Sequence, residues 1–199
     1  MTRSRSLGVM AAVAALALAA TPTFAQHEAP ADSMDDMTVE VTGVEYAFTG
    51  LPETLPVGSQ LTFTNQGAEL HELVLVRIAD GVTESLEELL AMEAEGRDPM
   101  AEGLVEMVGA GPLLAMPGET AEGSLALDQE GQYVALCFIP QGFDPTALQA
   151  AGVGLEDLGP ETDPSTWPEE VQAIMANPPH LEGGMITEFL VTAGDETTA

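Results

Sequence analysis

The stretch "YVALCFIPQG", residues 133–142, decides the fold, because it joins a strand pattern to the only cysteine of the chain. Tyr133 and Cys137 lie on one face of the expected strand, and Val134 and Phe138 lie on the other. Apolar residues on both faces are typical of a strand that is covered on both sides. The stretch therefore predicts a central strand that carries a thiol at its end.

Turn residues divide the rest of the chain into further short strand-like runs. The runs are "MTVEVTGVEYAFTG" (37–50), "SQLTFTNQG" (59–67), "HELVLVRI" (71–78), "ETAEGSLALDQEG" (119–131) and "GMITEFLVTA" (184–193). Several short alternating strands with glycine-rich turns predict an all-β sandwich.

Two helical segments interrupt this pattern. A helical excursion is expected near 85–95, where Ser85 and Glu88 form a capping box and Gly96 suits the C-terminal stop. A longer helical insertion is expected near 141–178, with two short helices and proline-rich joints. Asp144 is the expected cap of its first helix.

The second helix of the insertion is expected to begin with a capping box between Thr166 and Glu169. A long insertion must be held by its own packing, and Trp167, the only tryptophan, is the expected anchor. Lengthening a surface loop costs little chain entropy, so strands can still be joined correctly across it.

The first 25 residues predict an exported protein. Residues 1–25 read as a signal peptide, with Arg3 and Arg5 before an apolar run that is too short to span a membrane. Residues 26–36 read as a flexible acidic lead-in, 37–193 as one domain and 194–199 as a tail. We expect a periplasmic or extracellular protein that is not an integral membrane protein.

The composition is strongly acidic. The chain has 33 acidic residues, four arginines and no lysine, with a formal net charge of −29. This charge argues against nucleic acid and anionic membranes as partners. Carboxylates spread along the whole chain favour a salt-adapted, halophilic surface over an acidic docking patch for a basic partner.

Four residues along the chain form a candidate metal site: His71, Cys137, His180 and Met185. Two imidazoles, one thiolate and one thioether are the ligand set of a mononuclear blue-copper centre. Taken singly, each has an ordinary explanation, and a buried cysteine is most often a small apolar residue. The order His–Cys–His–Met, with four residues between the last two, favours a single type-1 copper.

The sequence resembles the cupredoxins, the family of plastocyanin, pseudoazurin and azurin, over roughly residues 38–192. His71 in "NQGAELHELVL" matches the early ligand, and "CFIP", "PPH" and "GM" match an exported cupredoxin-like group at the later ligands. The resemblance implies a Greek-key cupredoxin sandwich. The chain departs from the family pattern in one respect, because 42 residues lie between Cys137 and His180.

The resemblance implies a one-electron carrier that exchanges electrons with an unidentified redox donor or acceptor. It implies that electrons pass through His180, with Leu181, Pro178 and Pro179 around it as the docking patch. The alternatives are an interaction module without a redox role and a periplasmic copper buffer or donor. The chain has only three histidines, which argues against a second, catalytic copper centre, so we expect a non-enzyme. We also expect a monomer.

Overall fold

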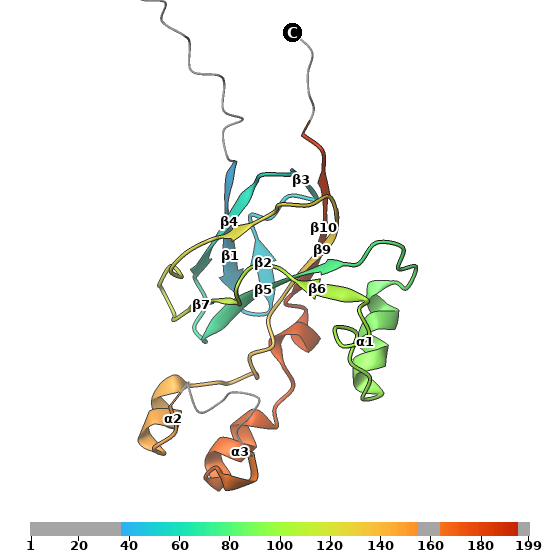
Figure 1. Cartoon of the computed structure of the whole chain (residues 1–199). Coiled ribbons are helices and arrows are strands. Elements are labelled where there is room, and N and C mark those ends of the chain that lie inside the picture. The colour runs from blue at the N-terminus through green and yellow to red at the C-terminus, as the bar shows by residue number, and fades with distance from the viewer. Residues whose placement is uncertain (1–36, 155–163, 195–199) are drawn as a thin grey trace, which may run out of the picture. The chain divides into compact units, whose positions relative to one another are not determined.

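Two β-sheets face each other and form the sandwich that the sequence predicts (Figure 1). The structure, a computed structural model, describes residues 37–154 and 164–194. The predicted signal peptide, the acidic lead-in, part of the insertion and nearly all of the tail lie outside these residues.

The first sheet has the strand order β2-β1-β4-β8 and the second the order β3-β10-β9-β5-β6, with β7 paired to β5. The strands of the first sheet are β1 (Thr38–Val44), β2 (Ala47–Thr49), β4 (Gln60–Asn65) and β8 (Leu125–Ala126). Those of the second are β3 (Thr54–Pro56), β5 (His71–Ile78), β6 (Val105–Met107), β9 (Gly131–Leu136) and β10 (Ile186–Thr192), with β7 (Leu113–Ala115) beside them.

The chain changes sheet several times along its length, which is the connectivity expected of a Greek-key sandwich. Strand β1 runs parallel to β4, and β3 runs parallel to β10, while the other pairs are antiparallel. At the centre of the second sheet, β9 pairs with both β5 and β10. The predicted all-β sandwich is therefore confirmed.

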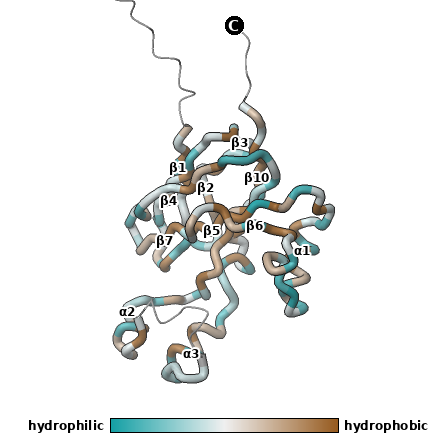
Figure 2. The backbone as a smooth tube through the Cα atoms, viewed as in Figure 1, coloured by the Kyte–Doolittle hydropathy of each residue, from teal (hydrophilic) through white to brown (hydrophobic). Residues whose placement is uncertain are grey.

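The main core lies between the sheets and follows the alternation in the sequence. Leu61, Phe63 and Leu73 are fully buried there, together with Tyr133 and Phe189. Figure 2 shows hydrophobic colour concentrated in the strands and hydrophilic colour over much of the first helix. Burial of apolar area between the sheets is the main stabilising term of such a fold.

The outer face of the second sheet carries an apolar layer of its own. Val74, Val76, Val134 and Leu136 form this layer, and Leu86 of α1 (Leu86–Ala94) packs against it. This arrangement explains why β5 and β9 read as continuous apolar runs, since both of their faces are covered. Strands β3, β6 and β7 were not predicted, because three residues are too few to show a period of two.

The helical excursion is confirmed with its capping box. The Ser85 side chain accepts a hydrogen bond from the Glu88 N–H, and the Glu88 carboxylate accepts one from the Ser85 N–H at 2.8 Å. Gly96 follows the helix end with a φ of +79°, a conformation that favours glycine.

The insertion contains α2 (Pro145–Ala150), η2 (Pro164–Thr166) and α3 (Glu169–Met175), and η3 (His180–Gly183) follows it. Asp144 caps α2 as predicted, through a hydrogen bond that its carboxylate accepts from the Thr146 N–H. The capping box predicted between Thr166 and Glu169 is wrong. Helix α3 begins at Glu169 with Pro168 as its N-cap, so Glu169 occupies the first helical position rather than the third.

The insertion builds a second apolar core. Phe143, Leu148, Val153 and Val171 are buried in it, and Leu70, which precedes β5, joins them. The partly buried side chains packed against this core are Met116, Ile139, Ala151, Trp167, Ile174 and Met175. Trp167, the expected anchor of the insertion, thus packs against this second core. Among the described residues, no helix is long and apolar enough to cross a membrane.

Candidate metal centre

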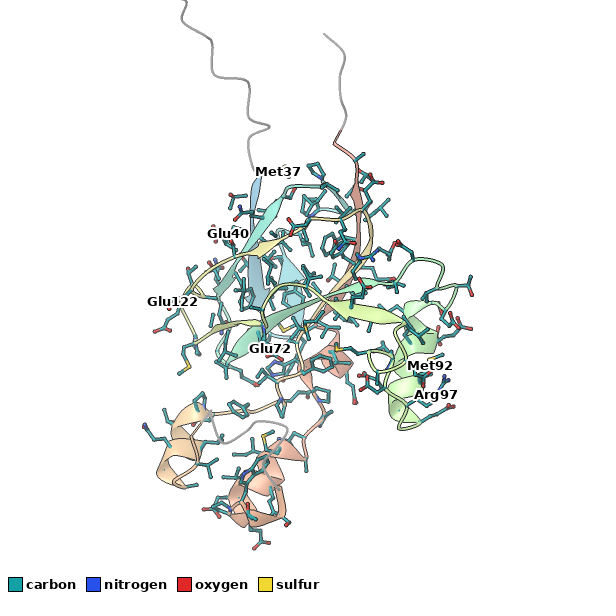
Figure 3. The ribbon with its side chains drawn as sticks, in the orientation of Figure 1. Met37, Glu40, Glu72, Met92, Arg97 and Glu122 are labelled. Atoms are coloured by element: carbon teal, nitrogen blue, oxygen red, sulfur yellow. The ribbon has the colours of Figure 1, made fainter. Side chains whose placement is uncertain are left out.

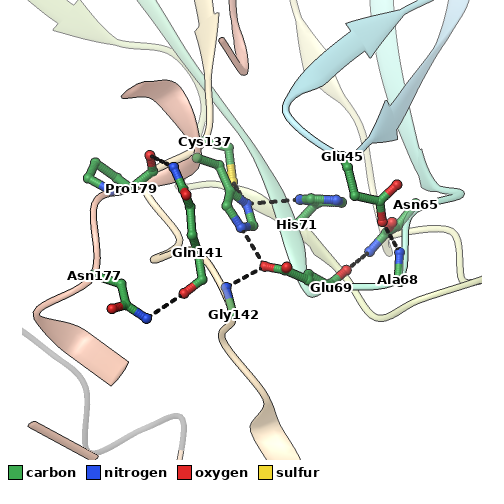
Figure 4. A network of polar contacts seen from close by, with 11 residues as sticks. Glu45, Asn65, Ala68, Glu69, His71, Cys137, Gln141, Gly142, Asn177 and Pro179 are labelled. Carbon is green, nitrogen blue, oxygen red and sulfur yellow. Dashed lines mark hydrogen bonds and ion pairs between the residues drawn. The ribbon is translucent and has the colours of Figure 1, made fainter. Parts of the chain in front are cut away.

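Three of the predicted ligands meet at one end of the sandwich. His71 begins β5, Cys137 follows the last residue of β9, and His180 begins η3. All three are fully buried. Their donor atoms lie within 4.8 Å of one another, with 3.0 Å between the two Nδ1 atoms and 3.4 Å between Cys137 Sγ and His180 Nδ1 (Figure 4).

The loop before His71 is shaped by Asn65, the last residue of β4. Its side-chain oxygen accepts a hydrogen bond from the Gly67 N–H at 2.8 Å, and its amide donates to the Glu69 and Ala115 carbonyls, each also at 2.8 Å. Gly67 lies against the imidazole of His71, where an added Cβ would approach Nε2 to 2.5 Å. This turn at Asn65–Gly67 therefore positions the first imidazole.

A short ladder of backbone hydrogen bonds joins Cys137 to His180 across the insertion; we call these two arms, residues 137–141 and 178–185, the stem. The Leu181 N–H donates to the Cys137 carbonyl at 3.0 Å, and the His180 N–H donates to the Ile139 carbonyl at 2.8 Å. The Gln141 N–H donates to the Pro178 carbonyl at 3.0 Å. The stem sets the two ligands side by side, so the length of the insertion does not separate them.

The orientation of the His180 ring is set by Glu69. The Nε2–H of His180 donates to the Glu69 carboxylate at 2.9 Å, and the same carboxylate oxygen accepts a hydrogen bond from the Gly142 N–H at 2.7 Å (Figure 4). A carboxylate only accepts, so the proton of the neutral ring lies on Nε2 and the lone pair lies on Nδ1. That lone pair faces His71 and Cys137.

Burial governs the protonation of the cluster. It raises the pKa of the Cys137 thiol to about 12, so the sulfur carries its proton until a cation replaces it. Burial, reinforced by His180, lowers the pKa of His71. The imidazole of His71 is therefore neutral near pH 7 and offers a lone pair.

Two further carboxylates lie near the cluster. Glu72, buried beside His71 in β5, accepts a hydrogen bond from the Phe138 N–H at 3.0 Å, and burial raises its pKa. Figure 3 shows Glu72 at the end of the sandwich that carries the site. Glu45 accepts a hydrogen bond from the Ala68 N–H, which lowers its pKa. The nitrogen and sulfur atoms of the buried cluster, with these carboxylates nearby, form surroundings that favour a bound cation.

Met185, the predicted fourth ligand, is fully buried at the end of the stem. Its N–H donates to the His180 carbonyl at 3.1 Å, and its carbonyl accepts from the Cys137 N–H at 3.2 Å. A Cβ added at Gly43 would come within 3.2 Å of its terminal methyl and within 2.8 Å of the Phe63 ring, so a side chain there would crowd both residues. Its backbone is thus tied to two of the predicted ligands, and its axial role stays a prediction.

The ring of His180, through which the resemblance implies that electrons pass, is fully buried. Glu69 covers its Nε2, and the Tyr46 ring stands edge-on to it with ring centroids 5.3 Å apart. Sequence reasoning missed Glu69 and Tyr46. A single carboxylate carries no signal among 33 acidic residues, and Tyr46 lies in a turn far from the ligands in sequence.

The donor set fits one metal ion. Bonds of about 2.0 Å to nitrogen and about 2.3 Å to sulfur place neighbouring donors roughly 3–4 Å apart around one ion, as the separations here do. The Nδ1 of His71 faces the cluster, and its Nε2 is buried without a hydrogen-bond partner among the described residues. Two imidazoles and one thiol suit a single copper that changes between its two oxidation states.

Comparisons with known proteins find similar solved structures, all at low sequence identity. The dithionite-reduced auracyanin of the photosynthetic bacterium Roseiflexus castenholzii is 18% identical, covering 78% of this chain and 97% of that chain, with a TM-score of 0.38. Auracyanin A, a blue copper protein of Chloroflexus aurantiacus, is 24% identical, covering 53% and 89%, with a TM-score of 0.31. A purple cupredoxin of Nitrosopumilus maritimus is 16% identical, covering 51% and 86%, with a TM-score of 0.28.

No family model and no curated protein matches the chain. The sandwich and its buried His–Cys–His cluster define a cupredoxin-like protein whose cluster fits a single copper. The resemblance predicted from the sequence is confirmed for the fold and for this cluster.

Proposed function

We propose that the chain is an exported type-1 copper protein that acts as a one-electron carrier. The observation that carries the proposal is the convergence of His71, Cys137 and His180 at the end of the sandwich. Bound copper would supply a couple of two oxidation states that differ by one electron. The proposed ligands are His71, Cys137 and His180 in a plane, with Met185 as the weak axial ligand.

The surroundings of the site suit electron transfer. Both imidazoles are held in place, one by the turn at Asn65 and the other by Glu69 and the stem. A cage of this kind keeps its donor atoms nearly fixed when the metal changes oxidation state, which lowers the cost of reorganisation. Complete burial excludes water from the donor atoms.

The site favours a carrier over a copper donor or an enzyme. All three donor side chains are fully buried beneath packed chain, which opposes rapid release of metal to an acceptor. Only His27 remains outside the cluster, and one imidazole is too few for a second copper centre of the all-histidine kind. The proposed partner is a redox protein or small redox molecule.

A visible absorption spectrum of the mature protein tests the copper site directly. We expect one equivalent of Cu(II) to produce an intense charge-transfer band that ascorbate bleaches. Substitution of the proposed thiolate ligand, Cys137→Ser, should abolish the band and leave the far-ultraviolet circular dichroism unchanged. A band that survives this substitution, or a folded protein that takes up no copper, would exclude the assignment.

A further inference from the structure

A hollow of about 290 Å³ lies on the outer face of the second sheet, beneath α1. The sheet contributes Val76, Val134 and Leu136 to its floor, and the helix contributes Leu86, Leu89 and Leu90 to its wall. Its volume is close to that of small-molecule sites, which are concave and mostly apolar. The main core lies on the opposite face of this sheet, so the hollow is separate from the sandwich interior.

The rim of the hollow exposes apolar side chains. Met100, Met107 and Phe138 are 42–43% exposed and all border it. They are half of the six large apolar side chains that are exposed among the described residues. Exposed apolar side chains around a hollow, on a chain with a formal charge of −29, are typical of a binding surface.

The charged groups in the lining are two carboxylates, those of Glu93 and Asp98. Partial burial among the apolar side chains, and then the charge of Asp98, raise the pKa of Glu93. Carboxylates accept hydrogen bonds and repel anions. A matching ligand therefore has an apolar body, bears no negative charge and donates a hydrogen bond.

The hollow and the proposed metal centre are formed in part by two consecutive residues of the chain. Phe138, on the rim of the hollow, is bonded directly to Cys137, which belongs to the metal cluster and does not line the hollow. The Phe138 N–H is held by the buried Glu72 carboxylate at 3.0 Å. By contrast, the histidine side of the centre is closed by Glu69 and Tyr46.

We propose that the hollow binds an uncharged aromatic alcohol of the hydroquinone class, which delivers electrons to the copper through Phe138 and Cys137. This proposal rests on the proposed function, because it names the electron donor of the same site. The bound alcohol loses one electron, which reduces Cu(II) to Cu(I). Its hydroxyl proton passes to the Glu93 carboxylate, and the neutral semiquinone radical leaves. The radical reduces a second copper, is oxidised to the quinone and loses its remaining hydroxyl proton to water.

Binding to the metal-free protein tests the site independently of copper. Trimethylhydroquinone, titrated without oxygen, is expected to displace the uncharged fluorophore N-phenyl-1-naphthylamine. Leu90→Trp fills the hollow from the helix side and should weaken binding by about tenfold or more, equivalent to at least 1.4 kcal/mol. The matched control is Leu190→Trp, an exposed leucine of β10 outside the hollow, which should bind as the native protein does.

Reduction kinetics test the electron route in the copper-loaded protein. The rate of bleaching should saturate with trimethylhydroquinone and rise linearly with ferrous EDTA, which as an anion does not enter the hollow. Leu90→Trp should remove the saturation and leave the ferrous EDTA rate unchanged. Glu93→Gln should slow only the hydroquinone reaction, because the proton acceptor is lost.

The two proposals fail in different ways. Trimethylhydroquinone binding without any copper uptake would sink the proposed function and leave the ligand site standing. Binding that Leu90→Trp leaves unchanged, or reduction of the native protein that never saturates, overturns the ligand proposal. If Leu90→Trp does not fold, Met100→Trp fills the rim from a surface loop and carries the same expectations.

Discussion

Tyr46 shows how one residue secures the site at a cost in backbone energy. It is the only non-glycine residue with a positive φ, +58°, within residues 37–154 and 164–194. Such a conformation is unusual for a bulky side chain and costs about 1–3 kcal/mol. The ring lies against Gly183, where an added Cβ would come within 2.9 Å of it, and stands edge-on to His180. The strain is therefore balanced by a contact with a proposed ligand.

Substitution of Tyr46 should change the retention of copper. An edge-to-face aromatic pair contributes about 0.5–1.5 kcal/mol, so Tyr46→Gly should release copper to a chelator roughly two- to tenfold faster. Tyr46→Phe keeps the ring and serves as the matched control, with release close to native. Stopped-flow release into a colorimetric chelator measures both rates. Equal rates in all three proteins would show that the ring does not protect His180.

Glu69 is the residue whose loss should weaken copper binding most among those that are not ligands. It holds the Nε2–H of His180 and the Gly142 N–H together. Partners of this kind typically contribute 10- to 100-fold to metal affinity, and Glu69→Gln should lose affinity within that range. Competition with a chelator of known affinity measures it.

The matched control for Glu69 is Glu182→Gln, which removes an exposed carboxylate from the η3 turn of His180. Its copper affinity should stay close to native. If both variants lose the same affinity, the effect is one of general charge rather than of the hydrogen bond to His180.

At the scale of elements, the stem and the helical insertion have separate roles. The backbone ladder from Cys137 to Met185 sets the ligands, and Asn177 closes its far end by donating to the Gln141 carbonyl at 2.8 Å. The helices beyond it contribute the second core over Leu70 and Phe143. The stem thus positions the ligands, and the helices add apolar packing around Leu70, the residue that precedes His71.

Replacement of residues 145–176 by a short glycine-serine linker tests this division. The stem remains, so the charge-transfer band should appear at its native wavelength. The second core is lost, so copper should pass to a chelator faster and the melting temperature should fall. A variant that folds but shows no band would mean that the helices themselves position His180.

At the scale of the whole molecule, the charge is the dominant feature. Figure 3 shows Glu40 and Glu122 on the outside of the first sheet, and both are exposed. Arg77, one of the four arginines, is buried and paired with Asp80 at 2.7 Å and Glu106 at 3.0 Å. Most carboxylates therefore have no cation to oppose them, and mutual repulsion destabilises the folded state.

Salt should stabilise the protein by screening this repulsion. The Debye length falls from about 10 Å at 0.1 M to about 3 Å at 1 M. The free energy of unfolding, from urea denaturation, should rise over that range of KCl. Sucrose at equal osmolality controls for solute exclusion and should give a smaller rise. A free energy that is flat or falls with KCl would contradict a salt-adapted surface.

Sequence reasoning predicted the sandwich because strand alternation is a local property. Leu61 and Phe63, and likewise Tyr133 and Ala135, lie two residues apart and enter the core together as expected. The capping box at Ser85 was predictable for the same reason. The capping box predicted at Thr166 does not form, because Pro168 is the N-cap and α3 begins at Glu169.

The donor types and their order along the chain, and the strand that begins with His71, follow directly from the amino-acid sequence. Tertiary structure was needed to bring Cys137 and His180 together through the stem across 42 residues. It also decided that Glu69 and Tyr46 close over the second imidazole. The physical reason is range: strand periodicity and capping depend on neighbours a few residues apart, whereas burial and hydrogen bonding of a ligand depend on segments that meet only after the chain has folded.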